Sequence, residues 1–293
     1  MSLKELERKS IEILKSFEPE TEPYYLCYSG GKDSDVIRIL ADLAGVNHDI
    51  VHNHTTVDMP ETVRYVRSIP NVIFNYPEKS MWQLIVDKGM PPTRLVRYCC
   101  EKLKERGGKG RVKITGVRWA ESKKRQSNAD VVKIIGKPKT TQKFADDIGA
   151  DYKVTKQQGL ILNDDNDESR RMVEHCYRTT STMINPIVNW SDNDVWDFLK
   201  YYGCQSNPLY QCGFKRIGCI GCPMADIKHR YTEFRLYPKY KNLYIKAFDR
   251  MLARSKKLGK SYKCDWQTGS DVFKWWTEED YRQITFDDLE MED

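Results

Sequence analysis

Residues 29–34 read Ser-Gly-Gly-Lys-Asp-Ser and stand between an apolar run, 24–28, and a helical-looking stretch that begins at Asp35. A Gly-Gly pair by itself equally indicates an ordinary tight turn. Here, however, the two glycines let the backbone turn its N–H groups inward, and the positive end of the following helix favours an anion there. The order of strand, glycine loop and helix therefore predicts a phosphate-binding loop, although the spacing is not that of a Walker A motif.

Strand-like and helical segments alternate on both sides of this loop. Strand candidates lie at 24–28, 49–54, 71–76 and 112–117, and helical stretches lie at about 33–44, from 60 onward, at 81–87 and around 99–106. This alternation predicts an α/β fold with a parallel sheet flanked by helices and a ligand at the carboxyl ends of the strands. The rhythm breaks from about 127 to 182, which we expect to be an insertion on the sheet. A helix at 192–202 and a long basic amphipathic helix at about 238–258 follow.

The composition is that of an ordinary globular protein. The chain has 293 residues, of which 40% are hydrophobic and 31% charged, enough for one large or two modest domains. Its N-terminus is charged and no 18 apolar residues run together, so we expect a cytoplasmic protein without a signal peptide or a membrane span. The net charge of +6 is spread over mixed basic and acidic residues; it allows a nucleic-acid partner without implying one.

The cysteines favour metal ligation or redox chemistry over a disulfide framework, because their number is odd, nine, and two close pairs occur. One pair is adjacent, at 99 and 100, and the other is a Cys-x-x-Cys-Pro knuckle at 219–223. Four thiolates suit either an iron–sulfur cluster or tetrahedral zinc. A rival set is local in sequence and therefore easier to close into one site; its members are Cys204, Cys212, Cys219 and Cys222.

Two polar segments follow the second and fourth strand candidates. Residues 56–62 carry carboxylate and hydroxyl oxygens that can accept from a ligand, although Asp58 or Thr56 can equally start a helix with Pro60 in its first turn. Residues 116–125 place two arginines, two lysines and a serine at one strand end. Because the planar arginine fork suits phosphate or sulfate oxygens, this segment predicts ligand binding rather than a solvated turn.

Five motifs occur in the order of a known family: the hexapeptide at 29–34, Asp-x-Pro-Glu-Thr at 58–62, Arg-Tyr-Cys-Cys at 97–100, Gly-Val-Arg-x-x-Glu-Ser at 116–122 and Asn-Pro-Ile-x-x-Trp-Ser at 185–191. Over roughly residues 20–225 the chain resembles the phosphoadenosine phosphosulfate (PAPS) reductase family of the PP-loop, adenine nucleotide alpha hydrolase-like superfamily. The resemblance implies a PAPS reductase-like α/β domain over 1–225, with the insertion at about 127–182, and a helical C-terminal extension over 226–293.

The resemblance also implies an adenine nucleotide as ligand: PAPS, adenosine phosphosulfate (APS) or ATP, with Mg²⁺ if ATP is the substrate. The implied nucleotide-binding residues are Ser29, Gly30, Gly31, Lys32, Asp33, Ser34, Asp58, Glu61, Thr62, Gly116, Arg118, Glu121, Ser122 and Arg125. Among them, Lys32 and Arg118 are the expected catalytic cations, because they can neutralise the phosphosulfate and the departing phosphate.

The assimilatory APS reductases of the resembled family hold a [4Fe–4S] cluster near the substrate with an adjacent cysteine pair and a distant Cys-x-x-Cys. By this resemblance the cluster ligands here are Cys99, Cys100, Cys219 and Cys222, with zinc as the alternative metal. The family reductases attack the sulfonucleotide with a thiolate on a C-terminal tail, and thioredoxin or glutathione then releases sulfite.

The tail motif of those reductases, Glu-Cys-Gly-x-His, does not occur in this sequence. Cys264 is the one cysteine after the knuckle and hence the candidate nucleophile, although its neighbour Asp265 opposes a low pKa and favours a packed or surface thiol. Three hypotheses follow: a sulfonucleotide reductase, an ATP-dependent sulfurtransferase acting on nucleic acid or a small molecule, and a non-catalytic nucleotide-binding regulatory partner.

Overall fold

The chain folds into two compact units. The structure, a computed structural model, describes residues 1–136, 138–155, 158–162, 166–176, 180–262, 264–278 and 289–291. The first unit comprises Met1–His52, Glu61–Asn75 and Gly107–Ile217, and the second comprises Asn53–Pro60, Tyr76–Arg106 and Gly218–Asp293. The domain boundary expected after residue 225 stays a prediction.

One sheet of eight strands, counted over the described residues, organises the first unit, in the order β3-β2-β1-β4-β8-β5-β7-β6. The strands are β1 (Tyr24–Cys27), β2 (His48–Asn53), β3 (Val72–Asn75), β4 (Lys113–Ile114), β5 (Val132–Ile135), β6 (Lys153–Val154), β7 (Leu160–Leu162) and β8 (Ser181–Ile184). β1 pairs in parallel with β2 on one side and β4 on the other, and β4 pairs in parallel with β8. The predicted α/β fold is confirmed, and the loop after β1 lies where the strand order reverses, the usual ligand position in such sheets.

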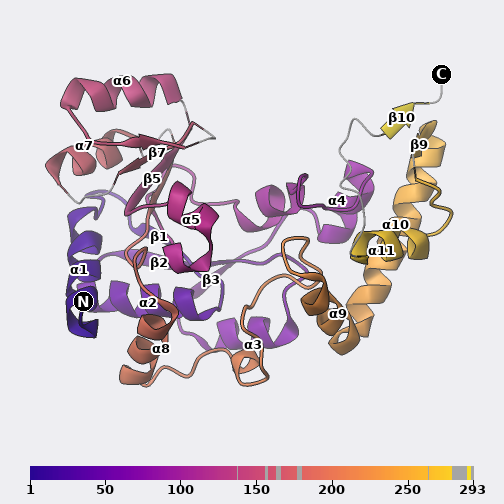
Figure 1. Cartoon of the computed structure of the whole chain (residues 1–293), viewed down its shortest axis with the longest axis horizontal. Helices are drawn as coiled ribbons and strands as arrows, with labels where there is room; N and C mark the ends of the chain where they lie inside the picture. The colour runs from indigo at the N-terminus through magenta and orange to yellow at the C-terminus, as the bar shows by residue number, and fades with distance from the viewer. Residues whose placement is uncertain are drawn as a thin grey trace. The chain divides into compact units, whose positions relative to one another are not determined.

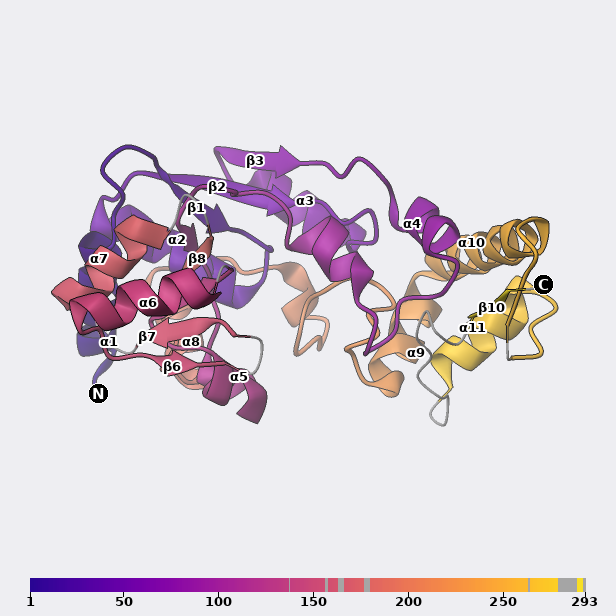
Figure 2. The same cartoon turned by 90° about the horizontal axis from the view of Figure 1, so that it is seen from above.

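The region that breaks the sequence rhythm extends this sheet. β5 pairs antiparallel with β8 and β7, and β6 pairs antiparallel with β7. The helices α6 (Pro138–Ile148) and α7 (Asp167–Cys176) pack against each other and against these strands (Figure 2). The insertion thus adds antiparallel strands at one edge of the parallel strands, beyond β8. The loops that follow β1 and β4 keep the positions expected for a parallel sheet.

Three helices bury the core of the first unit. These are α1 (Leu3–Ser16), α2 (Lys32–Ala44) and α8 (Asp192–Tyr201), which pack on one another. Their apolar faces bury Leu14, Leu40 and Phe198 completely, and burial of this kind is the main stabilising term of a fold. The remaining elements of this part of the fold are α3 (Pro60–Ser68), η2 (Trp119–Glu121), α5 (Lys123–Asn128) and η3 (Pro208–Tyr210).

The second unit is largely helical (Figure 1). Its elements are α4 (Met81–Lys88), η1 (Cys100–Lys104), α9 (Ile227–Leu236), α10 (Pro238–Lys257), β9 (Lys260–Tyr262), α11 (Gly269–Thr277) and β10 (Leu289–Met291), which pairs antiparallel with β9. Tyr244 and Phe248 of α10 are buried against the ring of Trp276, with centroid distances of 4.7 and 5.5 Å. Among the described residues, none of the helices combines the length and the apolar character needed to cross a membrane.

Candidate nucleotide and metal sites

The loop after β1 is shaped by local hydrogen bonds and one distant side chain. The N–H of Gly31, the N-cap of α2, donates to the Ser34 hydroxyl (3.1 Å), and that hydroxyl donates to the Gly31 carbonyl (2.7 Å). The Lys32 N–H donates to the Tyr210 hydroxyl at 2.9 Å. Because the first N–H groups of a helix have no partner within the helix, this hydroxyl occupies a place where an anion's oxygen can bind.

Two glycines let neighbouring segments approach the loop closely. Gly30 has φ +74°, and a Cβ there would lie 2.7 Å from Val66 Cγ2 of α3. A Cβ on Gly116 would lie 3.0 Å from the main-chain oxygen of Asp33. Asn207 Nδ2 donates to the Gly30 carbonyl at 3.0 Å. The loop is therefore fixed from three sides, which is the rigidity that a preorganised anion site needs.

Two cations and two carboxylates meet beside the loop. Lys32 Nζ lies 2.9 Å from Asp192 Oδ1, and Arg118 donates to Asp33 Oδ1 (2.7 Å) and to the same Asp192 oxygen (2.8 Å). Burial opposes the charge on Arg118, which is 1% exposed, but Asp33 and Asp192 raise the pKa of Arg118. The hydrogen bond from Lys32 lowers the pKa of Asp192. An incoming phosphate would compete with these carboxylates for both cations.

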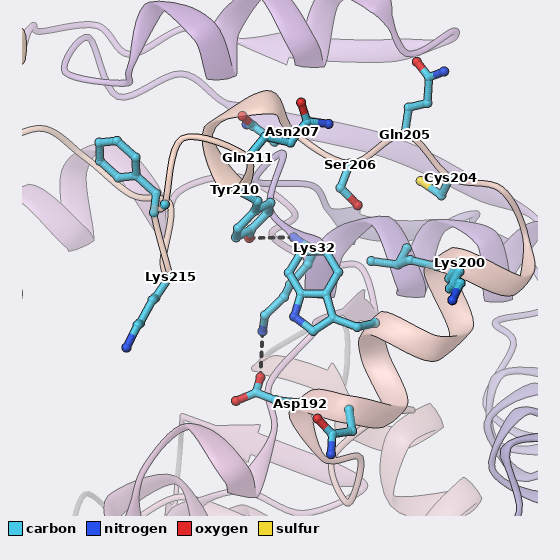
Figure 3. A pocket seen from close by; sticks show the side chains of 15 residues that line it. Lys32, Asp192, Lys200, Cys204, Gln205, Ser206, Asn207, Tyr210, Gln211 and Lys215 are labelled. Atoms are coloured by element: carbon cyan, nitrogen blue, oxygen red, sulfur yellow. Dashed lines mark hydrogen bonds and ion pairs between the residues drawn. The ribbon is translucent and has the colours of Figure 1, made fainter.

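A cavity of about 910 Å³ opens beside this charged group, at the upper end of the volumes usual for small-molecule sites. Its wall includes Lys32, Asp192, Trp196 and Tyr210. In Figure 3 the Lys32 side chain reaches toward Asp192 while the Tyr210 hydroxyl faces the start of α2. Lys215 lines the same cavity and points away from Lys32. The cavity thus connects the loop with an aromatic and basic wall.

The second unit brings four cysteines together. Cys99 is buried and precedes the π-helical turn η1, in which the Glu105 N–H donates to the Cys100 carbonyl at 2.7 Å. The pKa of Cys99 is raised by its side-chain hydrogen bond with Cys100, then by burial, and then by the negative charges of Cys100, Cys219 and Cys222. Thiolate sets of this kind can ligate an iron–sulfur cluster or a zinc ion, but among the described residues no three of these Sγ atoms lie within 4.8 Å of one another.

The Cys-x-x-Cys knuckle is held by the C-terminal helices. The Gly221 N–H donates to Glu233 Oε2 of α9 at 2.8 Å, and the Tyr244 hydroxyl of α10 donates to the Ile220 carbonyl at 2.9 Å. Gly221 has φ +72°, and a Cβ there would lie 3.0 Å from the Trp276 ring of α11. The segment after residue 225 therefore supports the knuckle directly through three helices.

Residues 23–225 match the family described as "Phosphoadenosine phosphosulfate reductase domain". The chain belongs to the PAPS reductase family. The match contains both the glycine loop after β1 and the Cys-x-x-Cys knuckle, so the two candidate sites of this PAPS reductase family member lie within the matched region. The family resemblance inferred from the five sequence motifs is confirmed.

Several known proteins are similar to this family member. Two uncharacterized proteins of Methanocaldococcus jannaschii are 26% and 25% identical over 270 and 247 residues, covering 85% and 81% of this chain but 54% and 45% of their own. The chain therefore spans about half the length of these curated relatives. The adenosine 5'-phosphosulfate reductase of Allochromatium vinosum is 40% identical over 42 residues, 14% of this chain and 16% of that protein.

Among solved structures, the PAPS reductase of Candida auris in a phosphate complex aligns with a TM-score of 0.44 and 17% identity, over 74% of this chain and 93% of that one. Likeness at this level is too weak to argue from. The topology described above carries the fold assignment by itself.

Several predicted nucleotide-binding residues have local partners. Ser122 caps α5 by accepting from the Arg125 N–H (3.2 Å), and Glu121 accepts from the Arg118 N–H (3.1 Å). Glu61 lies 3.0 Å from Arg64 in an ion pair on the first turn of α3. These contacts order the segments, and the nucleotide role of the three residues Glu61, Glu121 and Ser122 stays a prediction.

Two residues of the Asp-x-Pro-Glu-Thr segment, Asp58 and Thr62, belong to different units. Thr62 is buried in the first unit, where its hydroxyl accepts from Asn207 Nδ2 at 3.1 Å. Asp58 belongs to the second unit, where its carboxylate accepts from the N–H and the hydroxyl of Thr55, both at 2.7 Å. The expected helix start is confirmed, since α3 begins at Pro60, whereas the Asp58 carboxylate bonds back to Thr55; the expected contact of Asp58 with a nucleotide stays a prediction.

The other three cysteines named in the sequence analysis differ in exposure and in the unit to which they belong. Cys204 is half-buried in the first unit, where burial raises its pKa, and Cys212 is exposed in the same unit. Cys264 is half-buried in the second unit. Cys204 and Cys212 thus sit in a different unit from the knuckle, whereas Cys99 and Cys100 share its unit.

Sequence reasoning missed Tyr210, Asn207 and Trp196. Asn207-Pro208 is a turn signal, and it does begin the short helix η3. The local sequence, however, gives no indication that Tyr210 and Asn207 form hydrogen bonds with a loop about 180 residues earlier.

Proposed function

We propose that this PAPS reductase family member binds an adenine nucleotide or sulfonucleotide at its PP-loop and carries out sulfur transfer or reduction with a cysteine-ligated [4Fe–4S] cluster. The observation that carries the proposal is that Lys32 and Arg118 both pair with Asp192 beside the N-terminus of α2, in a chain whose family acts on nucleotide sulfates. Both cations are almost fully buried, so they are preorganised for an anion that can displace Asp33 and Asp192.

The binding step follows from these residues. The helix terminus and the amides of residues 29–34 favour the phosphate, while Lys32 and Arg118 exchange their carboxylate partners for phosphate or sulfate oxygens. The same cations would then neutralise the charge that develops on the departing nucleotide. Gly116 and Arg125, with the other predicted contact residues, would complete the pocket around the ligand.

The proposed cluster ligands are Cys99, Cys100, Cys219 and Cys222, with zinc as the alternative metal. When bound, a [4Fe–4S] cluster supplies an iron centre whose potential depends on the hydrogen bonds and burial around its sulfurs. Those surroundings include the buried Cys99 and the Thr55 hydroxyl, to which the Cys219 thiol donates at 3.5 Å. Burial raises the pKa of Cys219 to about 12, a penalty on the free thiolate that binding to metal would offset.

Further parts of the proposal concern the co-reactants. A reductive reaction would use thioredoxin or glutathione as thiol donor, with Cys264 as the chain's own candidate nucleophile. ATP as substrate would bring Mg²⁺ with it. We further propose a cytoplasmic location, where free thiols stay reduced.

A direct test combines metal analysis with nucleotide binding. Protein purified without oxygen should contain iron and sulfide, and calorimetry should detect APS, PAPS or ATP. Arg118→Gln should weaken that binding at least tenfold, because a buried bidentate cation is lost. Arg8→Gln, which removes an exposed arginine in an i,i+4 pair with Glu12, should bind as the wild type does. Failure of all three nucleotides to bind, or equal binding by both variants, would contradict the proposal.

A second candidate is an ATP-dependent sulfurtransferase that acts on a nucleic acid, and the exposed basic helix α10 favours it. Release of pyrophosphate from ATP would separate it from the reductase, which instead releases sulfite from APS or PAPS. A non-catalytic regulatory partner would bind nucleotide and show neither release.

A further inference from the structure

Helix α10 concentrates the positive charge of the chain. Its twenty residues contain seven basic side chains and one acidic side chain, a net charge of +6. This equals the net charge of all 293 residues, so the remainder of the sequence is balanced. All seven basic residues of α10 are exposed. A solvated helix face usually mixes both signs, whereas α10 exposes seven basic residues and one acidic residue, Asp249.

Four of these residues fall on one line along the helix. Lys239, Lys246, Arg250 and Lys257 are separated by seven, four and seven residues, which is about two, one and two turns at 3.6 residues per turn. The line is about 27 Å long at a rise of 1.5 Å per residue. Arg250 Nε donates to the Lys246 carbonyl at 3.2 Å, so its side chain lies along this line. We call these four residues the basic stripe.

The stripe has few protein partners. Within the described part of the chain, none of its four side chains forms an ion pair, whereas the neighbouring Arg254 pairs with Asp87 of α4. The one acidic residue of α10, Asp249, accepts from the Gly269 N–H at the start of α11 (2.5 Å). Ion pairing among the described residues therefore does not explain the basic stripe.

The opposite face of α10 is already buried. Tyr244 packs edge-on against Trp82 of α4 at 4.9 Å and with tilted rings against Trp276 of α11 at 4.7 Å, and Met251 is fully buried. A helix that lies on a membrane needs a free apolar face to insert. Here that face belongs to the core of the second unit, which leaves charge as the means of recognition.

We propose that the basic stripe binds the phosphodiester backbone of a single-stranded nucleic acid. A straight row of cations spaced about 6 to 10 Å apart along the axis can follow several consecutive phosphates of a flexible strand, and release of condensed counterions drives such binding. Contacts of this kind position a strand without reading its sequence. The inference does not depend on the nucleotide chemistry proposed for the PP-loop.

The test is fluorescence anisotropy with a labelled 20-nucleotide single strand of mixed sequence, between 50 and 200 mM salt. The full chain is used, so that its last sixteen residues, with eight acidic side chains and one basic, are present. Four phosphate contacts should give a slope of log affinity against log salt near −3, at about −0.7 per contact. Replacing the stripe by Lys239→Gln, Lys246→Gln, Arg250→Gln and Lys257→Gln together should lower affinity at least tenfold at 50 mM salt and flatten the slope.

A matched control removes four exposed lysines of the first unit: Lys4→Gln, Lys9→Gln, Lys15→Gln and Lys143→Gln. Because it changes the net charge equally, it should keep wild-type affinity and slope within about twofold. Circular dichroism checks that both variants are folded.

Equal losses in the two variants, no loss in the stripe variant, or no binding by the wild type at 50 mM salt would each overturn the proposal. Binding to phosphatidylserine vesicles without binding to the oligonucleotide would also overturn it, in favour of a membrane surface. Failure to bind APS, PAPS or ATP counts against the PP-loop proposal and leaves this one standing.

Discussion

The backbone N–H of Lys32 donates to the hydroxyl of Tyr210, 178 residues later in the chain, at 2.9 Å. The bond ties the first residue of α2 to the helical turn η3. It also places a neutral oxygen where the helix terminus favours an anion. A phosphate that uses the Lys32 N–H must therefore displace the Tyr210 hydroxyl.

Tyr210→Phe removes that hydroxyl and leaves the ring beside Trp196, with which it packs edge-on at 5.0 Å. Without an anion the variant should lose about 1 kcal/mol of unfolding free energy, the usual value of one hydrogen bond. Saturating pyrophosphate should narrow this difference, because the freed N–H then binds an anion oxygen. Urea denaturation in phosphate-free buffer, with and without pyrophosphate, measures both values. Tyr201→Phe, at an exposed tyrosine of α8, serves as the control; an unchanged difference on adding pyrophosphate would contradict the displacement.

Asp192 offers a second prediction, because one of its oxygens accepts from both Lys32 and Arg118. Asp192→Asn keeps the shape but removes a negative charge next to the anion site. Affinity for an adenine nucleotide should rise about three- to tenfold, as expected for a partly exposed charge a few ångströms away. Calorimetric titration measures it. Asp197→Asn, at an exposed position of the same helix, should leave the affinity unchanged, and a weaker complex with Asp192→Asn would show that the carboxylate serves to position the cations.

The sequence was sufficient for the fold because its decisive signals are local. The first strand, the glycine loop and the start of α2 are adjacent, and the structure gives β1 as Tyr24–Cys27 and α2 as Lys32–Ala44. The segment around Cys99 was expected to be an ordinary helix, but the bond from the Glu105 N–H to the Cys100 carbonyl makes it a π-helical turn. Hydrophobic periodicity cannot distinguish an α-helix from a π-helical turn in a segment that is short and partly buried.

The candidate site was only partly accessible from the sequence. Lys32 and Arg118 were recognised because each follows a strand, whereas Tyr210 and Asn207 reach the loop by tertiary packing that no local pattern encodes. The choice between the two cysteine sets was open for a related reason. Proximity in sequence favoured Cys204 and Cys212, but the fold places Cys99 and Cys100 in the same unit as the knuckle.

The buried carboxyl group of Asp35 should make the stability of the fold depend on pH. Burial raises the pKa of Asp35 to about 6, and its carboxylate accepts from the Tyr28 hydroxyl at 2.5 Å. The unfolded chain, with a pKa of about 3.9, loses this proton first as pH rises. The contribution of Asp35 to stability therefore falls between about pH 4 and pH 6 and is constant above, at a cost on the order of 3 kcal/mol at neutral pH.

Asp35→Asn cannot ionise and keeps an oxygen that accepts from Tyr28. It should be more stable than the wild type at pH 7 and nearly equal to it at pH 4, as measured by urea denaturation at each pH. Asp42→Asn, on the exposed side of the same helix, should not reproduce this trend. A difference between Asp35→Asn and the wild type that stays constant over this range would argue against a raised pKa.

The cysteine sets can be separated by single substitutions, because each has members that the other lacks. Cys99→Ser and Cys212→Ser both remove one thiol, from a buried and an exposed position respectively. If the second unit holds the metal, Cys99→Ser should lose most of the iron and sulfide while Cys212→Ser keeps them, and Cys222→Ser should lose them in either case. Loss of iron from Cys212→Ser alone would instead identify the ligands as the set that is local in sequence.

Cys264→Ser controls for the general effect of removing a half-buried thiol and should keep its iron. Since a thiolate ligand lost from a four-thiolate site leaves one iron without its protein partner, iron and sulfide analysis of protein purified without oxygen reads the outcome directly.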